Sequence, residues 1–138
     1  MTGRFAAVVA AVMVLAPAAP GWATHAVDHR YVVLGYVRDG TGRPLAGTPV
    51  RVVRERTGLA YEAASGPDGF YLAIVHLHDE DLSDVLDVTA GHVTVRIEVR
   101  FQRLERRRPR GTRVDFTPTR ADERHEAFAR TLDAYLKR

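Results

Sequence analysis

The chain of 138 residues contains no cysteine, and this absence excludes several classes of protein at once. Without thiols there is no disulfide framework, no thiolate zinc or iron–sulfur site and no cysteine nucleophile. A bacterial lipoprotein anchor is excluded as well, because that anchor requires a cysteine that can be acylated. The sequence therefore predicts a domain that is held together by its apolar core alone.

Residues suited to nucleophilic catalysis are also scarce. Ser65 and Ser83 are the only serines, and neither lies in a G-x-S-x-G motif. His92 and His125 are isolated in the sequence, with no acid or nucleophile placed beside them in a recognisable catalytic pattern. We therefore expect no catalytic residue and predict that the protein is not an enzyme.

No apolar run is long enough to span a membrane. The longest, residues 5–16, would reach roughly 18 Å as a helix, whereas the hydrocarbon core is roughly 30 Å thick. Arg4 precedes this run, and small residues and prolines follow it, which is typical of a secretory signal. We predict a signal peptide over residues 1–23, cleaved after Ala23 or Ala26, and a periplasmic or secreted protein with no stable membrane span. The alternative is an uncleaved amphiphilic anchor.

The middle of the chain alternates apolar and polar residues with a period of two, which is typical of β-strands with one exposed face. In one segment Val50 and Val52 alternate with Arg51 and Arg54, so we expect buried valines and solvent-facing arginines. Turn-forming residues separate such segments at the spacing of a β-sandwich. The predicted strands occupy residues 31–38, 48–56, 59–64, 70–76, 85–89, 92–101 and 113–116.

Two of the turns combine an aspartate with a glycine. Asp39 and Asp68 are expected to accept hydrogen bonds from backbone amides of their own turns. Gly42 and Gly69 are expected to adopt the positive φ that tight turns require. These are structural roles.

The segments around these turns, GYVRDGTGRPLAG at residues 35–47 and DGFYL at residues 68–72, resemble the carboxypeptidase regulatory-like domain family. The resemblance covers residues 33–75 and extends loosely through residues 85–99. It implies an all-β fold: a seven-stranded transthyretin-like or Ig-like Greek-key β-sandwich. It implies no chemistry, because the zinc ligands of metallocarboxypeptidases belong to a separate catalytic domain.

The tail changes to helical periodicity. Thr119 can cap a helix, and residues 120–136 predict a short C-terminal amphipathic helix that packs against the sandwich or a partner. An oligomer that buries this helix is an open alternative. Its apolar face would comprise Phe128, Leu132, Tyr135 and Leu136. The predicted organisation is an N-terminal signal helix at 1–23, the β-sandwich at 24–118 and the C-terminal helix at 119–138.

Charge divides the mature chain into two unequal parts. Residues 24–99 carry 7 arginines and 11 acidic residues, whereas residues 100–138 carry 12 basic and 6 acidic residues. Much of the positive charge lies in the stretch around Arg100 to Arg110 (RFQRLERRRPR), which holds six arginines. An acidic body with a basic C-terminal third is the result.

This basic stretch suggests an anionic partner. Nucleic acid is not expected, because export removes the chain from it and Phe101 is the only aromatic residue available for base stacking. We expect a protein or an anionic envelope component, such as lipid headgroups or an acidic polysaccharide. The alternative is a solvated loop between two strands.

A histidine pair offers a second kind of site. On a strand, His76 and His78 would present both imidazoles on one face, with the carboxylates of Asp79 and Asp81 following. Imidazole with carboxylate suits zinc, copper or nickel. The alternative is a strand end that leads into a solvated acidic loop, and we assign no metal, cofactor or catalytic residue. Near the start of the mature chain, His25 and His29 could complete a metal site with His76 and His78 if the first strand ran alongside them.

The leading hypothesis is an exported, non-catalytic β-sandwich module that acts in protein–protein or envelope-surface binding. The alternative is a periplasmic metal-binding accessory protein that uses the His76 and His78 cluster.

Overall fold

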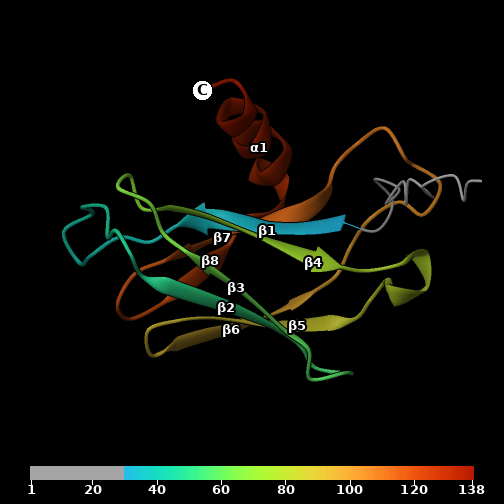
Figure 1. The fold of residues 1–138 in the computed structure, drawn as a ribbon, viewed down its shortest axis with the longest axis horizontal. Coiled ribbons are helices and arrows are strands. Elements are labelled where there is room, and N and C mark those ends of the chain that lie inside the picture. The colour runs from blue at the N-terminus through green and yellow to red at the C-terminus, as the bar shows by residue number, and fades with distance from the viewer. Residues whose placement is uncertain (1–29) are drawn as a thin grey trace, which may run out of the picture.

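The computed structural model describes residues 30–138, which form two β-sheets packed face to face, with one helix on the outside (Figure 1). The predicted signal peptide, both of its cleavage positions, His25 and His29 lie outside the described residues. No helix within residues 30–138 is long and apolar enough to cross a membrane.

The strands form two sheets of four. One sheet has the order β4-β1-β7-β8 and the other the order β3-β2-β5-β6. Neighbouring strands are antiparallel except β1 and β7, which run parallel. The elements are β1 (Arg30–Tyr36), β2 (Pro49–Arg54), β3 (Ala60–Ala64), β4 (Phe70–His76), the 3-10 turn η2 (Asp79–Asp81), β5 (Val85–Ala90), β6 (Val93–Glu98), β7 (Arg110–Phe116), β8 (Ala121–Glu123), the 3-10 turn η3 (His125–Ala127) and α1 (Phe128–Leu136).

The core lies between the sheets, where the inward-facing apolar side chains of both layers meet. On β2, Val50 and Val52 are fully buried and Arg51 is exposed, as the alternation predicted. Tyr31 and Val33 of β1 enter the same cluster from the opposite sheet. Burial of such rows is the main stabilising contribution in a domain without disulfides.

The prediction that Arg54 faces solvent is wrong. Only 7% of the Arg54 surface is exposed, because Arg54 is two residues from Val52 on β2 and therefore points to the same inner face as Val50 and Val52. Its charge is tolerated there because the carboxylates of Asp81 and Asp84 lie 3.1 and 2.7 Å from its Nη2 atom.

The predicted total of seven strands is wrong as well. A strand overlaps each of the seven predicted segments, but the eighth, β8, lies where the helix was expected to begin. The Thr117 N–H donates to the Arg120 carbonyl oxygen at 2.9 Å, and this turn brings β8 back alongside β7. Pairing with an existing strand therefore outweighs the local helical preference of an acidic first turn, which is worth a few tenths of a kcal/mol.

The C-terminal helix is consequently shorter than residues 120–136. Thr119 does not cap it, since α1 starts at Phe128 after η3. Phe128 and Leu132 are buried against Val32, Leu34 and Phe70 on the outer face of the β4-β1-β7-β8 sheet. The helix thus packs on its own sandwich, which was one of the two expected possibilities.

The two aspartate–glycine turns form as predicted. The Asp39 Oδ1 atom accepts hydrogen bonds from the Thr41 and Arg43 N–H groups at 2.8 and 3.0 Å. Gly42 and Gly69 have φ values of +85° and +79°, as expected for their turns. These turns fix the ends of the strands and take no part in the candidate site.

Candidate functional site

The stretch between β6 and β7 forms an irregular loop at one end of the sandwich, the end at which β1 begins and β4 terminates (Figure 1). We call residues 100–109 the basic loop. Near the turn at residues 103–104 its exposed side chains include Arg103, Leu104, Arg106, Arg107 and Arg108, and Arg100 and Gln102 are exposed before the turn. The predicted basic stretch is therefore a surface feature, and most of its charge faces solvent.

Arg110 differs from the other arginines because it is buried at the base of the basic loop. Its residue is 8% exposed, and its Nη1 atom donates to the Asp79 Oδ1 atom of η2 at 2.7 Å. Its Nη2 atom donates to the Arg103 carbonyl oxygen at 3.0 Å, and its guanidinium lies 4.1 Å from the centre of the Phe101 ring. Arg110 is therefore a positioning residue that ties the loop to the sandwich.

The Arg110–Asp79 contact is an ion pair, because the surroundings of Asp79 favour its ionised form. The hydrogen bond from Arg110, with the nearby charges of Arg106 and Arg103, holds the pKa of the Asp79 carboxyl below its ordinary value. The carboxylate is accordingly ionised at neutral pH, and it offsets part of the positive charge at the loop base.

The one acidic residue of the basic loop is directed back onto the backbone. Glu105 closes a turn, in which its N–H donates to the Gln102 carbonyl oxygen at 3.1 Å. Its carboxylate accepts a hydrogen bond from the Arg107 N–H at 2.7 Å and is only partly exposed. Turning this acid onto the loop backbone leaves the arginines to dominate the outward-facing charge.

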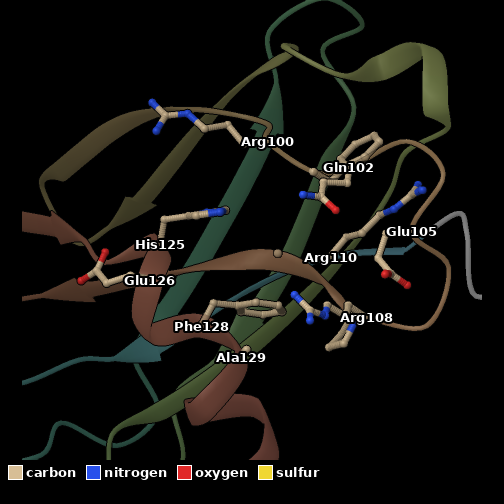
Figure 2. Close-up of a pocket in the computed structure, with 12 residues that line it drawn as sticks. Arg100, Gln102, Glu105, Arg108, Arg110, His125, Glu126, Phe128 and Ala129 are labelled. Atoms are coloured by element: carbon tan, nitrogen blue, oxygen red, sulfur yellow. The ribbon is translucent and has the colours of Figure 1, made fainter.

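An open groove of about 700 Å³ lies between the basic loop, the start of β7 and the η3–α1 segment (Figure 2). Phe101 and Phe128 give it apolar walls, and Arg108 and His125 contribute polar groups from opposite sides. His125 is thus part of this groove, although nothing in the sequence placed it near the basic stretch. Apolar walls beside arginine side chains suit a binding groove, which Glu105 and Glu126 also line.

The two rings of the histidine pair lie close together, but the expectation that both lie on a strand is wrong: His76 is the last residue of β4, and His78 lies beyond it, directly before η2. The ring centres of His76 and His78 are 4.8 Å apart, edge to face. The carboxylates expected to join them are engaged elsewhere: Asp79 pairs with Arg110, and Asp81 pairs with Arg54. Within residues 30–138 no group of three histidine or acidic side chains could hold a metal ion.

The serines serve the fold. The Ser65 hydroxyl is buried, donates to the Leu45 carbonyl oxygen at 2.6 Å and accepts from the Thr48 N–H at 2.9 Å. Ser83 occupies a turn with a φ of 72°, and its N–H donates to the Val99 carbonyl oxygen. Neither contact joins a serine to a histidine.

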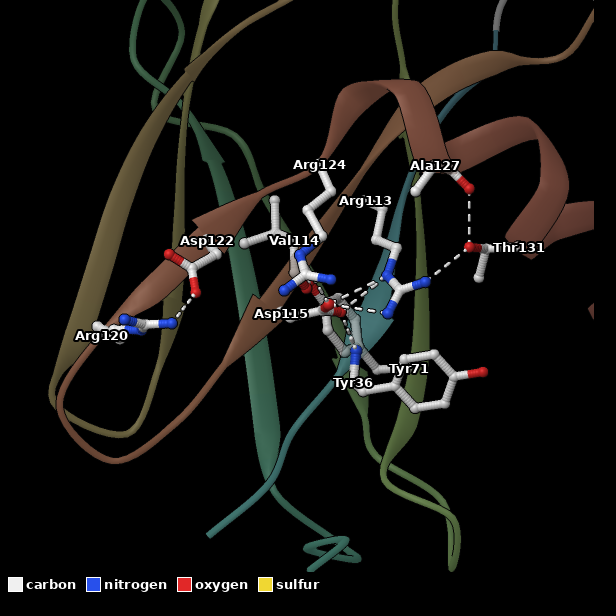
Figure 3. Close-up of polar contacts among 10 residues, drawn as sticks. All are labelled: Tyr36, Tyr71, Arg113, Val114, Asp115, Arg120, Asp122, Arg124, Ala127 and Thr131. Atoms are coloured by element: carbon white, nitrogen blue, oxygen red, sulfur yellow. Dashed lines mark hydrogen bonds and ion pairs between the residues drawn. The ribbon is translucent and has the colours of Figure 1, made fainter. Parts of the chain in front are cut away.

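A second polar cluster, centred on Asp115, is also structural (Figure 3). The Asp115 carboxylate accepts hydrogen bonds from the Tyr36 N–H at 3.0 Å and from Arg113 Nε at 3.0 and 3.1 Å. Arg113 Nη1 donates to the Thr131 hydroxyl of α1 at 3.0 Å, and the Asp115 bonds raise the pKa of this guanidinium. These bonds link β1, β7 and α1, so the cluster locks the helix to the sheet.

Comparison with solved structures shows a distant structural similarity. No protein-family model matches the chain, and no curated protein sequence matches it. The chain is similar to the dioxygenase domain of a dioxygenase–carbohydrate-binding protein fusion from the cellulolytic bacterium Streptomyces sp. SirexAA-E, with 14% sequence identity and a TM-score of 0.47. The match covers 68% of this chain and 82% of that domain. This similarity assigns neither a family nor an activity to the chain.

Proposed function

We infer that this chain is an exported, non-catalytic β-sandwich module that binds an anionic protein or envelope component through the basic loop. The observation that carries the proposal is the group of exposed arginines at and after the turn of the basic loop, Arg103, Arg106, Arg107 and Arg108. These side chains belong to a chain whose residues 24–99 are acidic overall, so approach of an anionic partner is favoured from one end.

The finer identity of the fold is part of the proposal. The motif at residues 35–47 and 68–72 supports a transthyretin-like Greek-key sandwich of the carboxypeptidase regulatory-like kind, to which β8 and α1 are added. Export through the signal peptide at residues 1–23 would place the module in the periplasm or outside the cell. Nucleic acid is not a proposed partner, because export would separate the chain from it and Arg110 already stacks on one face of Phe101, the only aromatic residue of the basic loop.

The proposal that the protein is non-catalytic is supported by the ion pairs that several of its carboxylates form. Asp81 and Asp84 are paired with Arg54, and Asp115 is paired with Arg113. Each of these carboxylates is held in an ion pair, so none of the three is set apart for acid–base chemistry.

The proposal is tested by binding to a defined polyanion, dextran sulfate. The triple variant Arg106→Gln, Arg107→Gln, Arg108→Gln is expected to bind about tenfold more weakly than wild type at low salt. The matched control removes the same net charge elsewhere on the surface, at Arg43, Arg51 and Arg130. Equal weakening of both triple variants would refute a localised site and would leave only a general effect of net charge.

Metal binding is the alternative function, and the 4.8 Å separation of the His76 and His78 rings is the observation that favours it. Calorimetric titration with zinc, copper and nickel separates the two possibilities. For a binding module without metal, the wild type and the His76→Ala, His78→Ala double variant give the same background heats. A saturable heat in the wild type that disappears in the double variant would establish the alternative instead.

A further inference from the structure

The basic loop also carries the most exposed of the large apolar side chains among residues 30–138. Leu104 exposes 90% of its surface, compared with 72% for Leu136 at the end of α1 and 55% for Leu59 in the β2–β3 turn. Leu104 makes almost no use of its apolar surface within the fold, so that surface is available for burial in a partner.

The surroundings of Leu104 are strongly cationic. Arg103 and Arg106 flank it closely, and Arg107 and Arg108 follow, all of them exposed. Glu105 is folded onto the Arg107 N–H, as described above.

The acidic residues of the neighbouring turn η2 are mostly neutralised by arginines. Asp79 pairs with Arg110, and Asp81 pairs with Arg54 and Arg56. Glu80 is the exposed acid of this turn. The end of the sandwich that carries Leu104 therefore presents an excess of positive charge.

We propose that the basic loop docks on an anionic lipid bilayer, with Leu104 inserted at the boundary between headgroups and acyl chains. This inference rests on the proposed function and names the partner of the same surface. An isolated apolar side chain among arginines suits a bilayer, because arginines can hold phosphates while a neighbouring side chain enters the acyl region. A protein interface instead concentrates several apolar anchors in a core that is poor in charge.

The geometry favours docking by this loop. Arg110 fixes the loop base to η2 and to Phe101, so the exposed segment is presented from an ordered support. Figure 1 shows the loop extending away from the end of the two sheets, where it can reach a flat surface ahead of the strands. Charge attraction and insertion act on the same surface, and two such signals hold a protein at a membrane more stably than either one alone.

Vesicle binding of the full chain tests the inference. Wild type is expected to bind vesicles of phosphatidylglycerol and phosphatidylcholine about six-hundredfold more tightly than vesicles of phosphatidylcholine alone, since each of the four arginines around Leu104 contributes about fivefold near an anionic surface. Leu104→Ser is expected to weaken binding to the anionic vesicles about tenfold. Arg106→Gln, Arg107→Gln, Arg108→Gln is expected to weaken it about a hundredfold.

Matched controls separate the loop from the rest of the surface. Leu136→Ser removes an exposed leucine from α1, and the triple variant at Arg43, Arg51 and Arg130 removes three exposed arginines elsewhere. Both controls are expected to change vesicle binding less than threefold. All variants share the same N-terminal segment, so any contribution of its apolar run is constant and also appears with neutral vesicles.

Insertion of Leu104 has its own readout. Because the chain lacks cysteine, Leu104→Cys introduces a single thiol for an environment-sensitive dye. We expect the dye emission to shift to the blue with anionic vesicles, and Leu136→Cys to show no shift. A blue shift absent at position 104, or unchanged vesicle binding in Leu104→Ser, would overturn the insertion.

The outcomes also distinguish this inference from the proposed function. If the loop variants alter dextran sulfate binding but not vesicle binding, the bilayer is refuted and a different anionic partner remains. If they alter neither, both the bilayer and the proposed function fail.

Discussion

Replacement of Gly35 by alanine is expected to destabilise the protein by about 3 kcal/mol or more, because a side chain at this position would collide with the backbone of β7. A Cβ atom added to Gly35 would lie 1.8 Å from the Val114 carbonyl oxygen. That carbonyl cannot easily turn away, since it accepts a hydrogen bond from the buried Tyr71 hydroxyl at 2.7 Å. The neighbouring Tyr36 N–H donates to the Asp115 carboxylate instead of to a backbone carbonyl (Figure 3).

Urea denaturation followed by circular dichroism measures this effect. Gly40→Ala is the matched control, because no atom lies within 4 Å of the added Cβ at that turn position. Its free energy of unfolding is expected to stay within about 0.5 kcal/mol of wild type. A Gly35→Ala variant as stable as Gly40→Ala would show that β1 and β7 do not approach each other this closely.

Replacement of Asp81 by asparagine is expected to cost about 3 kcal/mol of unfolding free energy, because it breaks a buried ion cluster. The side chains of Arg54 and Asp81 are only 8% and 5% exposed, so loss of one charge leaves the other poorly compensated. Asp84 still lies 2.7 Å from Arg54, which keeps the loss below that of a fully isolated charge. The Asp81 carboxylate also accepts the His78 N–H at 2.7 Å.

The same variant has a predictable pH dependence. Burial opposes ionisation of Asp81, but the His78 N–H and the Arg54 and Arg56 charges outweigh burial and lower its pKa below the ordinary 3.8. A lowered pKa contributes stability above about pH 4 that is lost as the pH falls through the folded-state value. The difference in stability between wild type and Asp81→Asn is therefore expected to shrink below about pH 4.

Chemical denaturation at several pH values checks both the size and the pH dependence of this loss. Asp133→Asn serves as the control, because its pair with Lys137 lies on the exposed face of α1. Such surface pairs contribute about 0.5 kcal/mol or less. A difference between wild type and Asp81→Asn that persists unchanged at low pH would argue against a buried, ionised Asp81.

Much of the sandwich can be predicted from the sequence because its strands and turns are specified by residues that are close together in the chain. The alternation that contains Val50 and Val52 identifies a strand and its buried face, and Asp39 and Asp68 identify turns whose hydrogen bonds lie within a few residues. Each of these features depends on near neighbours in the chain, so a single sequence is enough to find it.

Long-range contacts explain the wrong predictions. Arg54 shares the inward parity of Val50 and Val52, and its charge is tolerated there because Asp81 and Asp84 approach it from a distant loop, an approach that no local pattern reveals. Residues 121–123 form a strand because β7 offers them a partner, although their acidic composition favours the first turn of a helix. Tertiary pairing decided both cases against local preference.

In the candidate site, too, some features follow from local sequence patterns and others depend on long-range contacts. The arginine content of the basic loop is visible in the sequence, and so is the two-residue spacing of His76 and His78, whose rings lie close together. The burial of Arg110 and the contribution of His125 to the groove depend on how η2 and η3 pack at the loop base. Which arginine supports the loop and which ones face a partner could be learned only from the structure.

The role of the basic loop is tested most directly by the equilibrium affinities of the two triple variants for one polyanion at the same low salt concentration. Both variants lose three positive charges, so any difference between them reports where the charge lies. We expect the variant at Arg106, Arg107 and Arg108 to bind about tenfold more weakly than the variant at Arg43, Arg51 and Arg130. Equal affinities would contradict a binding site at this loop.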